Sequence, residues 1–120
     1  MDNLMELIDR YIGMWNETDP ERRRALIAEV WTEDARYVDP VLQAEGRAGI
    51  DAMVCGVHER FPGHRFRRTG DPDVHHDRVR FNWELAPEAG PAVVNGVDFA
   101  VLADRRLQTV TGFFDHIATS

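Results

Sequence analysis

Asp98 is an acidic residue in a position where its carboxyl group could take part in a reaction as a hydrogen-bond donor. It lies inside the apolar run Val93 to Leu102, and alternate residues of a strand point to opposite faces. If the face that carries Asp98 packs on helices, its carboxyl is buried among apolar neighbours, and its pKa rises until the group holds a proton. A protonated carboxyl donates a hydrogen bond at neutral pH. The alternative is that Asp98 faces outward and pairs with an arginine such as Arg80.

Asp39 and Tyr11 are two further polar residues that could serve a site, and each can also be explained by a structural role. Asp39 precedes Pro40 at the end of a short strand, Ala35 to Val38, because proline restricts the residue before it and cannot donate to a strand ladder. A carboxylate in that place commonly caps nearby backbone amides. Tyr11 lies on an apolar helix stripe, where a core aromatic side chain usually directs its hydroxyl to a backbone carbonyl.

The sequence positions of the remaining reactive side chains favour structural roles for them. His75 and His76 are adjacent in a predicted hairpin, and adjacent strand residues point to opposite faces, so we expect no metal site. Cys55 is expected to be a core thiol without a disulfide partner. His58 and His116 are either pocket acid–bases or partly solvated structural histidines. The chain has no lysine and no glycine-rich phosphate loop, so Schiff-base chemistry is excluded and no cofactor is expected.

The composition favours one ordinary globular domain. The 120 residues predict a single domain over 1–120, with 43% hydrophobic and 29% charged residues. A net charge of −7 repels phosphate backbones, so we expect no nucleic-acid partner. No stretch approaches the ~18 apolar residues of a membrane span, so we expect no membrane partner and a cytoplasmic location.

Three apolar stripes with helical spacing are expected to pack on strands. The first runs from Leu4 to Trp15, and the third from Gly46 to Phe61. The second runs from Ala25 to Trp31, with Asp19 as the N-cap of its helix and Glu21 to Arg24 as a charged outer face. Helices that come first and strands that come last predict an α+β fold, with helices on one face of a curved sheet.

Strict alternation predicts antiparallel strands at 65–67, 78–85, 93–102 and 107–114. In the second of these, one face is entirely apolar and must pack on the helices; it carries Val79, Phe81, Trp83 and Leu85. In the strand through Asp98, both faces are largely apolar. We therefore expect the outer face of the sheet to be covered by a second copy of the chain, in a homodimer.

Several segments resemble the ketosteroid-isomerase branch of the NTF2-like superfamily, and more specifically the SnoaL-like proteins. The segments are Asp9–Ile12, Asp34–Val41, Val97–Phe99 and Thr111–Asp115, and the resemblance runs from about Leu4 to Asp115. It implies a cone-shaped α+β fold in which three N-terminal helices close a strongly curved, mostly antiparallel sheet around an apolar cavity. The same fold hosts many activities, so it implies the architecture more strongly than the reaction.

The resemblance also implies a site. Asp39 falls where the isomerases keep a general base that moves a proton between carbons of a bound ketone. Tyr11 and Asp98 fall where they keep two donors to the developing enolate oxygen. Residues implied to line the cavity are Trp15, Phe81, Trp83, Leu85, Val110, Gly112 and Phe114. The bulk of Trp15 and Trp83 favours a substrate smaller than a steroid.

Three classes of function stay open on this basis. The leading hypothesis is cofactor-free acid–base chemistry on a small apolar carbonyl or polyketide-like compound, either isomerisation or cyclisation, since both need a carboxylate base and donors to the oxygen. An epoxide hydrolase would instead divide an acid and a base between Asp98 and Asp39. The other classes are a non-catalytic small-molecule-binding domain and a dimerisation module that uses the outer sheet face.

Overall fold

A computed structural model describes residues 2–117, which form helices and strands in the order expected for an α+β fold. The helices of this part of the chain are α1 (Asp2–Asn16), α2 (Pro20–Val30) and α3 (Gly46–Arg60). Its strands are β1 (Trp31–Val38), β2 (Gln43–Glu45), β3 (His64–Arg68), β4 (Asp73–His75), β5 (Arg78–Pro87), β6 (Val94–Ala103) and β7 (Arg106–Ile117). No helix within residues 2–117 is long and apolar enough to cross a membrane.

The strands form one mixed sheet in the order β2-β1-β7-β6-β5-β3, and β4 pairs with β5. All pairings are antiparallel except that of β1 with β7, which is parallel. The expectation of a mostly antiparallel sheet is therefore confirmed. The parallel pairing was not predicted, and it places the end of β1 beside the middle of β7.

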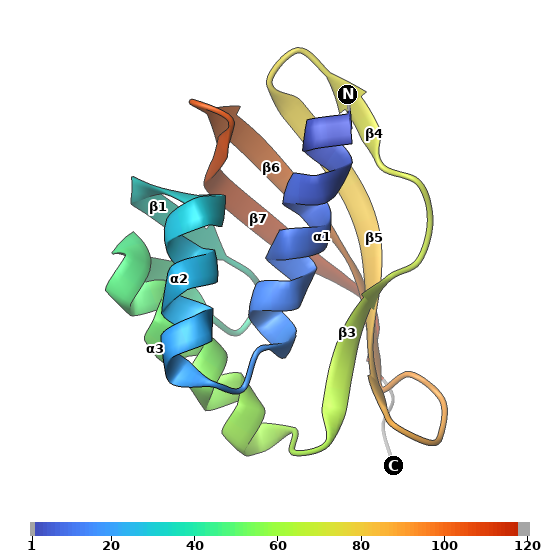
Figure 1. Cartoon of the computed structure of the whole chain (residues 1–120). Coiled ribbons are helices and arrows are strands. Elements are labelled where there is room, and N and C mark those ends of the chain that lie inside the picture. The colour runs from blue at the N-terminus through green and yellow to red at the C-terminus, as the bar shows by residue number, and fades with distance from the viewer. Residues whose placement is uncertain (1, 118–120) are drawn as a thin grey trace.

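The three helices cover one face of this curved sheet (Figure 1). The predicted inward face of β5 is confirmed, since Val79, Phe81, Trp83 and Leu85 are all buried. The predicted stripe of α3 is buried as well, from Ile50 to Val57. Asp19 caps α2 as expected, because its carboxylate accepts a hydrogen bond of 2.9 Å from the Arg22 amide. The core thus lies between the helices and the inner sheet face.

Two expectations about helix side chains are wrong. Arg23 does not belong to an exposed charged face of α2: it is only 4% exposed, and its Nε lies 2.6 Å from Oδ1 of Asp51 on α3. Its guanidinium also donates to the Glu17 carbonyl, so hydrogen bonds compensate the burial of its charge. Cys55 is exposed rather than part of the core, because the buried stripe of α3 passes through Met53, Val54 and Val57 and leaves Cys55 on the opposite side.

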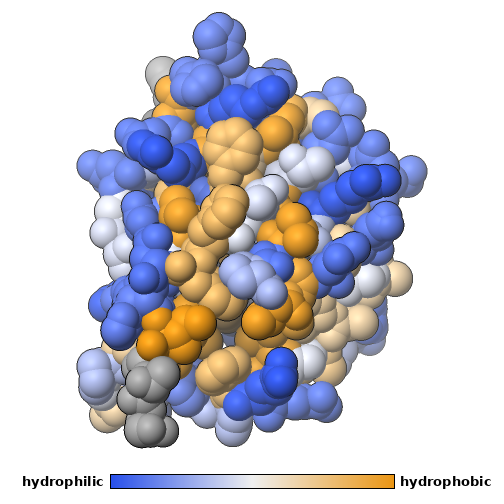
Figure 2. Space-filling view, turned by 180° about the vertical axis from the view of Figure 1, so that it is seen from behind, coloured by the Kyte–Doolittle hydropathy of each residue, from blue (hydrophilic) through white to orange (hydrophobic). Residues whose placement is uncertain are grey.

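The outer sheet face carries exposed apolar side chains. Phe113 is 56% and Phe99 39% exposed, and Val38 lies beside them, since both Val38 and Phe99 pair with Thr111 in the sheet. In Figure 2, which shows the molecule from behind, hydrophobic surface runs down the middle of this face between hydrophilic margins. We call Val38, Phe99 and Phe113 the outer patch.

Candidate functional site

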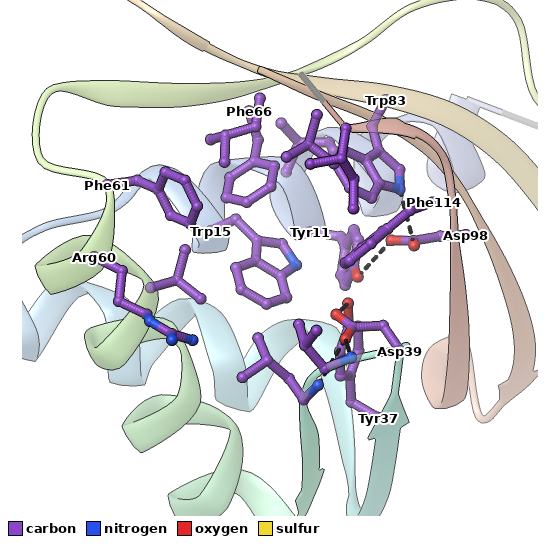
Figure 3. Close-up of a pocket in the computed structure, with 17 residues that line it drawn as sticks. Tyr11, Trp15, Tyr37, Asp39, Arg60, Phe61, Phe66, Trp83, Asp98 and Phe114 are labelled. Carbon is purple, nitrogen blue, oxygen red and sulfur yellow. Dashed lines mark hydrogen bonds between the residues drawn. The ribbon is translucent and has the colours of Figure 1, made fainter. Parts of the chain in front are cut away.

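Asp98 faces the helices, and its carboxyl is held by two donors. The side chain is 3% exposed. The Tyr11 hydroxyl on α1 donates to Oδ2 at 2.7 Å, and the Trp83 indole N–H on β5 donates to Oδ1 at 2.9 Å (Figure 3). Arg80, the alternative partner, instead forms an ion pair with Asp73 on the exposed side of the sheet. The Asp98 carboxyl is therefore a buried and hydrogen-bonded group.

A glycine allows Trp83 to reach Asp98. Gly96 lies directly across from Trp83 in the pairing of β5 with β6. A Cβ atom at Gly96 would overlap the indole ring, with Cε2 only 2.8 Å away. The missing side chain therefore lets the indole lie over β6 and point its N–H at Asp98, two residues further along that strand.

Asp39 is bound at the end of β1 by three donors. The Tyr37 hydroxyl donates to Oδ2 at 2.6 Å, and the amides of Val41 and Leu42 donate to Oδ1 at 2.8 and 2.7 Å. The carboxylate thus caps the turn, and it also lines the cavity described below. A carboxylate offers about four lone-pair positions, so one remains on Oδ2 for a proton from a ligand.

The two acidic groups meet over Gly112 on β7. A Cβ atom at Gly112 would lie 2.9 Å from Oδ1 of Asp98, 3.2 Å from Cβ of Asp39 and 3.3 Å from the Tyr37 hydroxyl. Figure 3 shows the carboxyls of Asp39 and Asp98 facing one another, with the Tyr11 hydroxyl beside Asp98. The structure therefore brings together the three residues Tyr11, Asp39 and Asp98.

Burial is the largest cause of the pKa shifts of Asp98, Tyr11 and Tyr37. It raises the pKa of Asp98 from 3.8 to about 7; the hydrogen bonds from Tyr11 and Trp83 oppose this rise, and the charge of Asp39 adds to it. Burial, and then the charge of Asp98, raises the pKa of Tyr11 well above its ordinary value. The pKa of Tyr37 is raised for the same reasons. Near neutral pH both phenols keep their protons, and Asp98 is divided between its two forms.

These groups lie at one end of an apolar cavity of about 370 Å³. Among the side chains expected to line it, Trp15, Trp83, Leu85 and Phe114 do so. Phe81 and Val110 do not line the cavity. Both are 1% exposed core residues, and Phe81 packs edge-on against the far side of Tyr11 at a ring distance of 5.7 Å. The remaining wall residues are Tyr11, Ile12, Tyr37, Asp39, Val41, Leu42, Val57, Arg60, Phe61, Phe66, Val94, Asp98 and Ile117.

Two polar wall residues, Tyr37 and Arg60, were not predicted. Tyr37 and Asp39 are two residues apart at a strand end, so they share a face, and this spacing could have linked them. Arg60 follows the buried residue Val57 by three positions on α3 and therefore lies on the same side of the helix. The side of α3 that Arg60 shares with Val57 borders the cavity.

The histidines lie away from this cavity wall. His58 is half-buried, and its Nε2 lies 2.7 Å from the Trp15 carbonyl, which ties α3 to α1; His116 is exposed on β7. The Nδ1 atoms of His75 and His76 lie 3.2 Å apart. They do not point to opposite faces, because His76 leaves the strand in a turn with φ 51°. No group of three metal-ligating side chains occurs within residues 2–117.

Comparison with known proteins agrees with this architecture. Residues 8–110 match the SnoaL-like domain family. A solved structure from Jannaschia sp. CCS1, provisionally named a SnoaL-like polyketide cyclase, is 21% identical over 95% of this chain and 86% of that chain, with a TM-score of 0.75. A provisionally named ketosteroid isomerase from Kribbella flavida is 20% identical over 99% of this chain and 82% of that chain, with a TM-score of 0.72. These two show the fold.

A third solved structure is similar in sequence as well. It comes from Agrobacterium tumefaciens strain C58 and is provisionally named an isomerase of the SnoaL-like family; it is 41% identical over 97% of this chain and 100% of that chain, with a TM-score of 0.91. Comparison with the curated proteins finds no significant match. With the domain matched over 8–110 and a relative of this similarity, the chain belongs to the SnoaL-like family and has its NTF2-like fold.

Proposed function

We propose that this protein catalyses cofactor-free proton transfer at a carbon next to a carbonyl group in a small apolar compound. The observation that carries the proposal is the meeting of Asp39 and Asp98 at one end of an apolar cavity, with the Tyr11 hydroxyl 2.7 Å from the Asp98 carboxyl. One carboxyl is half-buried and bound by three donors, while the other is 3% exposed. Carboxyls in such different environments can divide the roles of base and acid.

In the proposed step, Asp39 removes a proton from the carbon beside the carbonyl. The electrons of the broken C–H bond form a carbon–carbon double bond, and the carbonyl oxygen takes the negative charge. Protonated Asp98 donates its proton in a hydrogen bond to that oxygen, and the Tyr11 hydroxyl, which donates to Asp98 in the structure, turns its hydrogen to the same oxygen. Return of the proton to a different carbon completes an isomerisation. Attack of the enolate carbon on a second carbonyl of the same molecule completes a cyclisation, and the enolate step is common to both.

The test is exchange of the α-hydrogens of a small aryl ketone, 1-indanone, followed by NMR in deuterated buffer. Wild-type protein is expected to accelerate exchange. Asp39→Asn removes the base and should abolish the acceleration, while Asp98→Asn weakens the oxygen site and should slow exchange by roughly 10²–10³-fold. Asp71→Asn changes an exposed acid away from the cavity and should leave exchange unchanged.

Ketone binding is followed in parallel by tryptophan fluorescence, since Trp15 and Trp83 line the cavity. An Asp39→Asn protein that still exchanges at the wild-type rate would contradict the assignment of the base. Wild-type protein that binds the ketone without accelerating exchange would favour the alternative function, a non-catalytic binding domain of the same fold.

A further inference from the structure

Arg60 is a charged residue in the cavity wall that the proposed reaction does not use. It lies in the last turn of α3, and of the fourteen arginines of the chain it alone lines this cavity. The only other ionisable side chains in the wall, within residues 2–117, are the two aspartates and the two tyrosines already described. A guanidinium that borders an otherwise largely apolar wall is placed to pair with an anionic group of a ligand bound there.

Most other arginines have partners within the chain, and Arg60 has none within the described residues. Seven arginines form ion pairs with acidic side chains, namely Arg10, Arg23, Arg36, Arg67, Arg68, Arg78 and Arg80. Arg47 and Arg106 donate to backbone carbonyls. The Arg60 guanidinium makes neither kind of contact within residues 2–117, so all its donors are available to a ligand.

The position of Arg60 defines the two ends of a ligand. Figure 3 shows its side chain on the opposite side of the cavity from Asp98, with the ring of Phe61 on the Arg60 side and the ring of Trp15 between the two. The end of the cavity that carries Asp39 and Asp98 repels an anion, whereas Arg60 at the other end attracts one. An anionic ligand therefore binds with its acid group at Arg60 and its other end at Asp98 and Tyr11. The rings provide apolar contact for the part in between.

We propose that Arg60 selects an acidic substrate: a small apolar carbonyl compound that carries a carboxylate at the end remote from the reacting carbonyl. The inference rests on the proposed function for the orientation of the ligand. The cavity volume of about 370 Å³ lies near the lower end of the about 300–1,000 Å³ typical of ligand pockets, which favours a compact molecule. Guanidinium groups suit this role because they bind carboxylates through two parallel hydrogen bonds.

The test compares two probes of nearly equal shape, 4-acetylbenzoate and the uncharged 4-acetylbenzamide, by quenching of tryptophan fluorescence at low ionic strength. Wild-type protein should bind the benzoate roughly three- to tenfold more tightly, a modest preference because Arg60 is exposed to solvent. Arg60→Gln should bind both probes alike, and Arg60→Lys should keep part of the preference. Added salt should reduce the wild-type preference.

The matched control is Arg24→Gln, which removes the same charge from an exposed position on α2 outside the cavity wall. It should keep the wild-type preference. Equal binding of the two probes by wild-type protein, or an unchanged preference in Arg60→Gln, would overturn the inference, since Arg60 would then serve only the negative C-terminal end of α3. Either result leaves the proposed proton transfer intact. Failure of wild-type protein to bind either probe would overturn both.

Discussion

The burial of Asp98 predicts that replacing its carboxyl with an amide stabilises the protein at alkaline pH. Asp98→Asn keeps the shape of the side chain: its amide oxygen can accept from the Trp83 indole N–H, and its NH2 group can donate to the Tyr11 hydroxyl, which both donates and accepts. It removes the possibility of a negative charge in a position that is 3% exposed. In the wild-type protein this charge must form as the pH rises, and its burial disfavours it.

The sign and size follow from the two pKa values of Asp98. The folded protein holds the proton up to about pH 7, whereas the unfolded chain releases it near the ordinary value of 3.8. The contribution of Asp98 to folding stability is therefore fully present below the unfolded value and is lost as the pH rises through the folded one. The difference between these pKa values corresponds to ~4 kcal/mol in total, of which about 3 kcal/mol falls between pH 5 and pH 8.

Urea unfolding of wild-type and Asp98→Asn proteins across pH 5–8 measures this directly. The free energy of unfolding of the wild-type protein should fall relative to the variant by about 3 kcal/mol over that range. Asp71→Asn, at an exposed position, should run parallel to the wild type. Contributions from groups that both proteins share cancel in the difference. Parallel curves for wild type and Asp98→Asn would refute the assignment of Asp98 as a carboxyl that is neutral below pH 7.

Two further substitutions test neighbouring parts of the structure. Trp83→Phe removes the indole N–H that lowers the pKa of Asp98, so the stability loss should move to higher pH in the same urea series; an unmoved curve would show that this hydrogen bond is unimportant. Phe113→Arg places a charge in the outer patch, where Phe113 is 56% exposed. If two copies pair through this face, as we propose, wild-type protein should sediment as a dimer and the variant as a monomer, whereas a monomeric wild type would contradict the pairing.

The sequence was most informative where burial repeats with a fixed period. Alternation along β5 separates an apolar face from a polar one, and the structure buries Val79 to Leu85 on the predicted side. Both faces of β6 are largely apolar, so parity left Asp98 open between the inner face and an outward position beside Arg80, and the structure places it on the inner face. Tyr11 follows from the helical spacing of α1.

Contacts between distant segments were beyond such reasoning. Arg23 was assigned to a solvated face because the sequence does not show that Asp51 approaches it from α3. The cavity wall was also only partly predictable: Phe81 and Trp83 share a face of β5, yet Phe81 packs behind Tyr11 while Trp83 borders the open space. Which of two inward residues meets a cavity depends on the tilt of the helices, and periodicity carries no information about that.

Sheet register explains why the acidic cluster exists at all. Asp39 follows β1, whose last residue Val38 pairs with Thr111 through the parallel contact with β7. Asp98 pairs with Gly112, the next residue of β7, through the antiparallel contact with β6. A slip of one residue in either pairing would turn one carboxyl to the outer face of the sheet. Because Gly112 has no side chain, the two acids approach closely enough for the charge of Asp39 to raise the pKa of Asp98. The electrostatics of the site are therefore a property of three strands together.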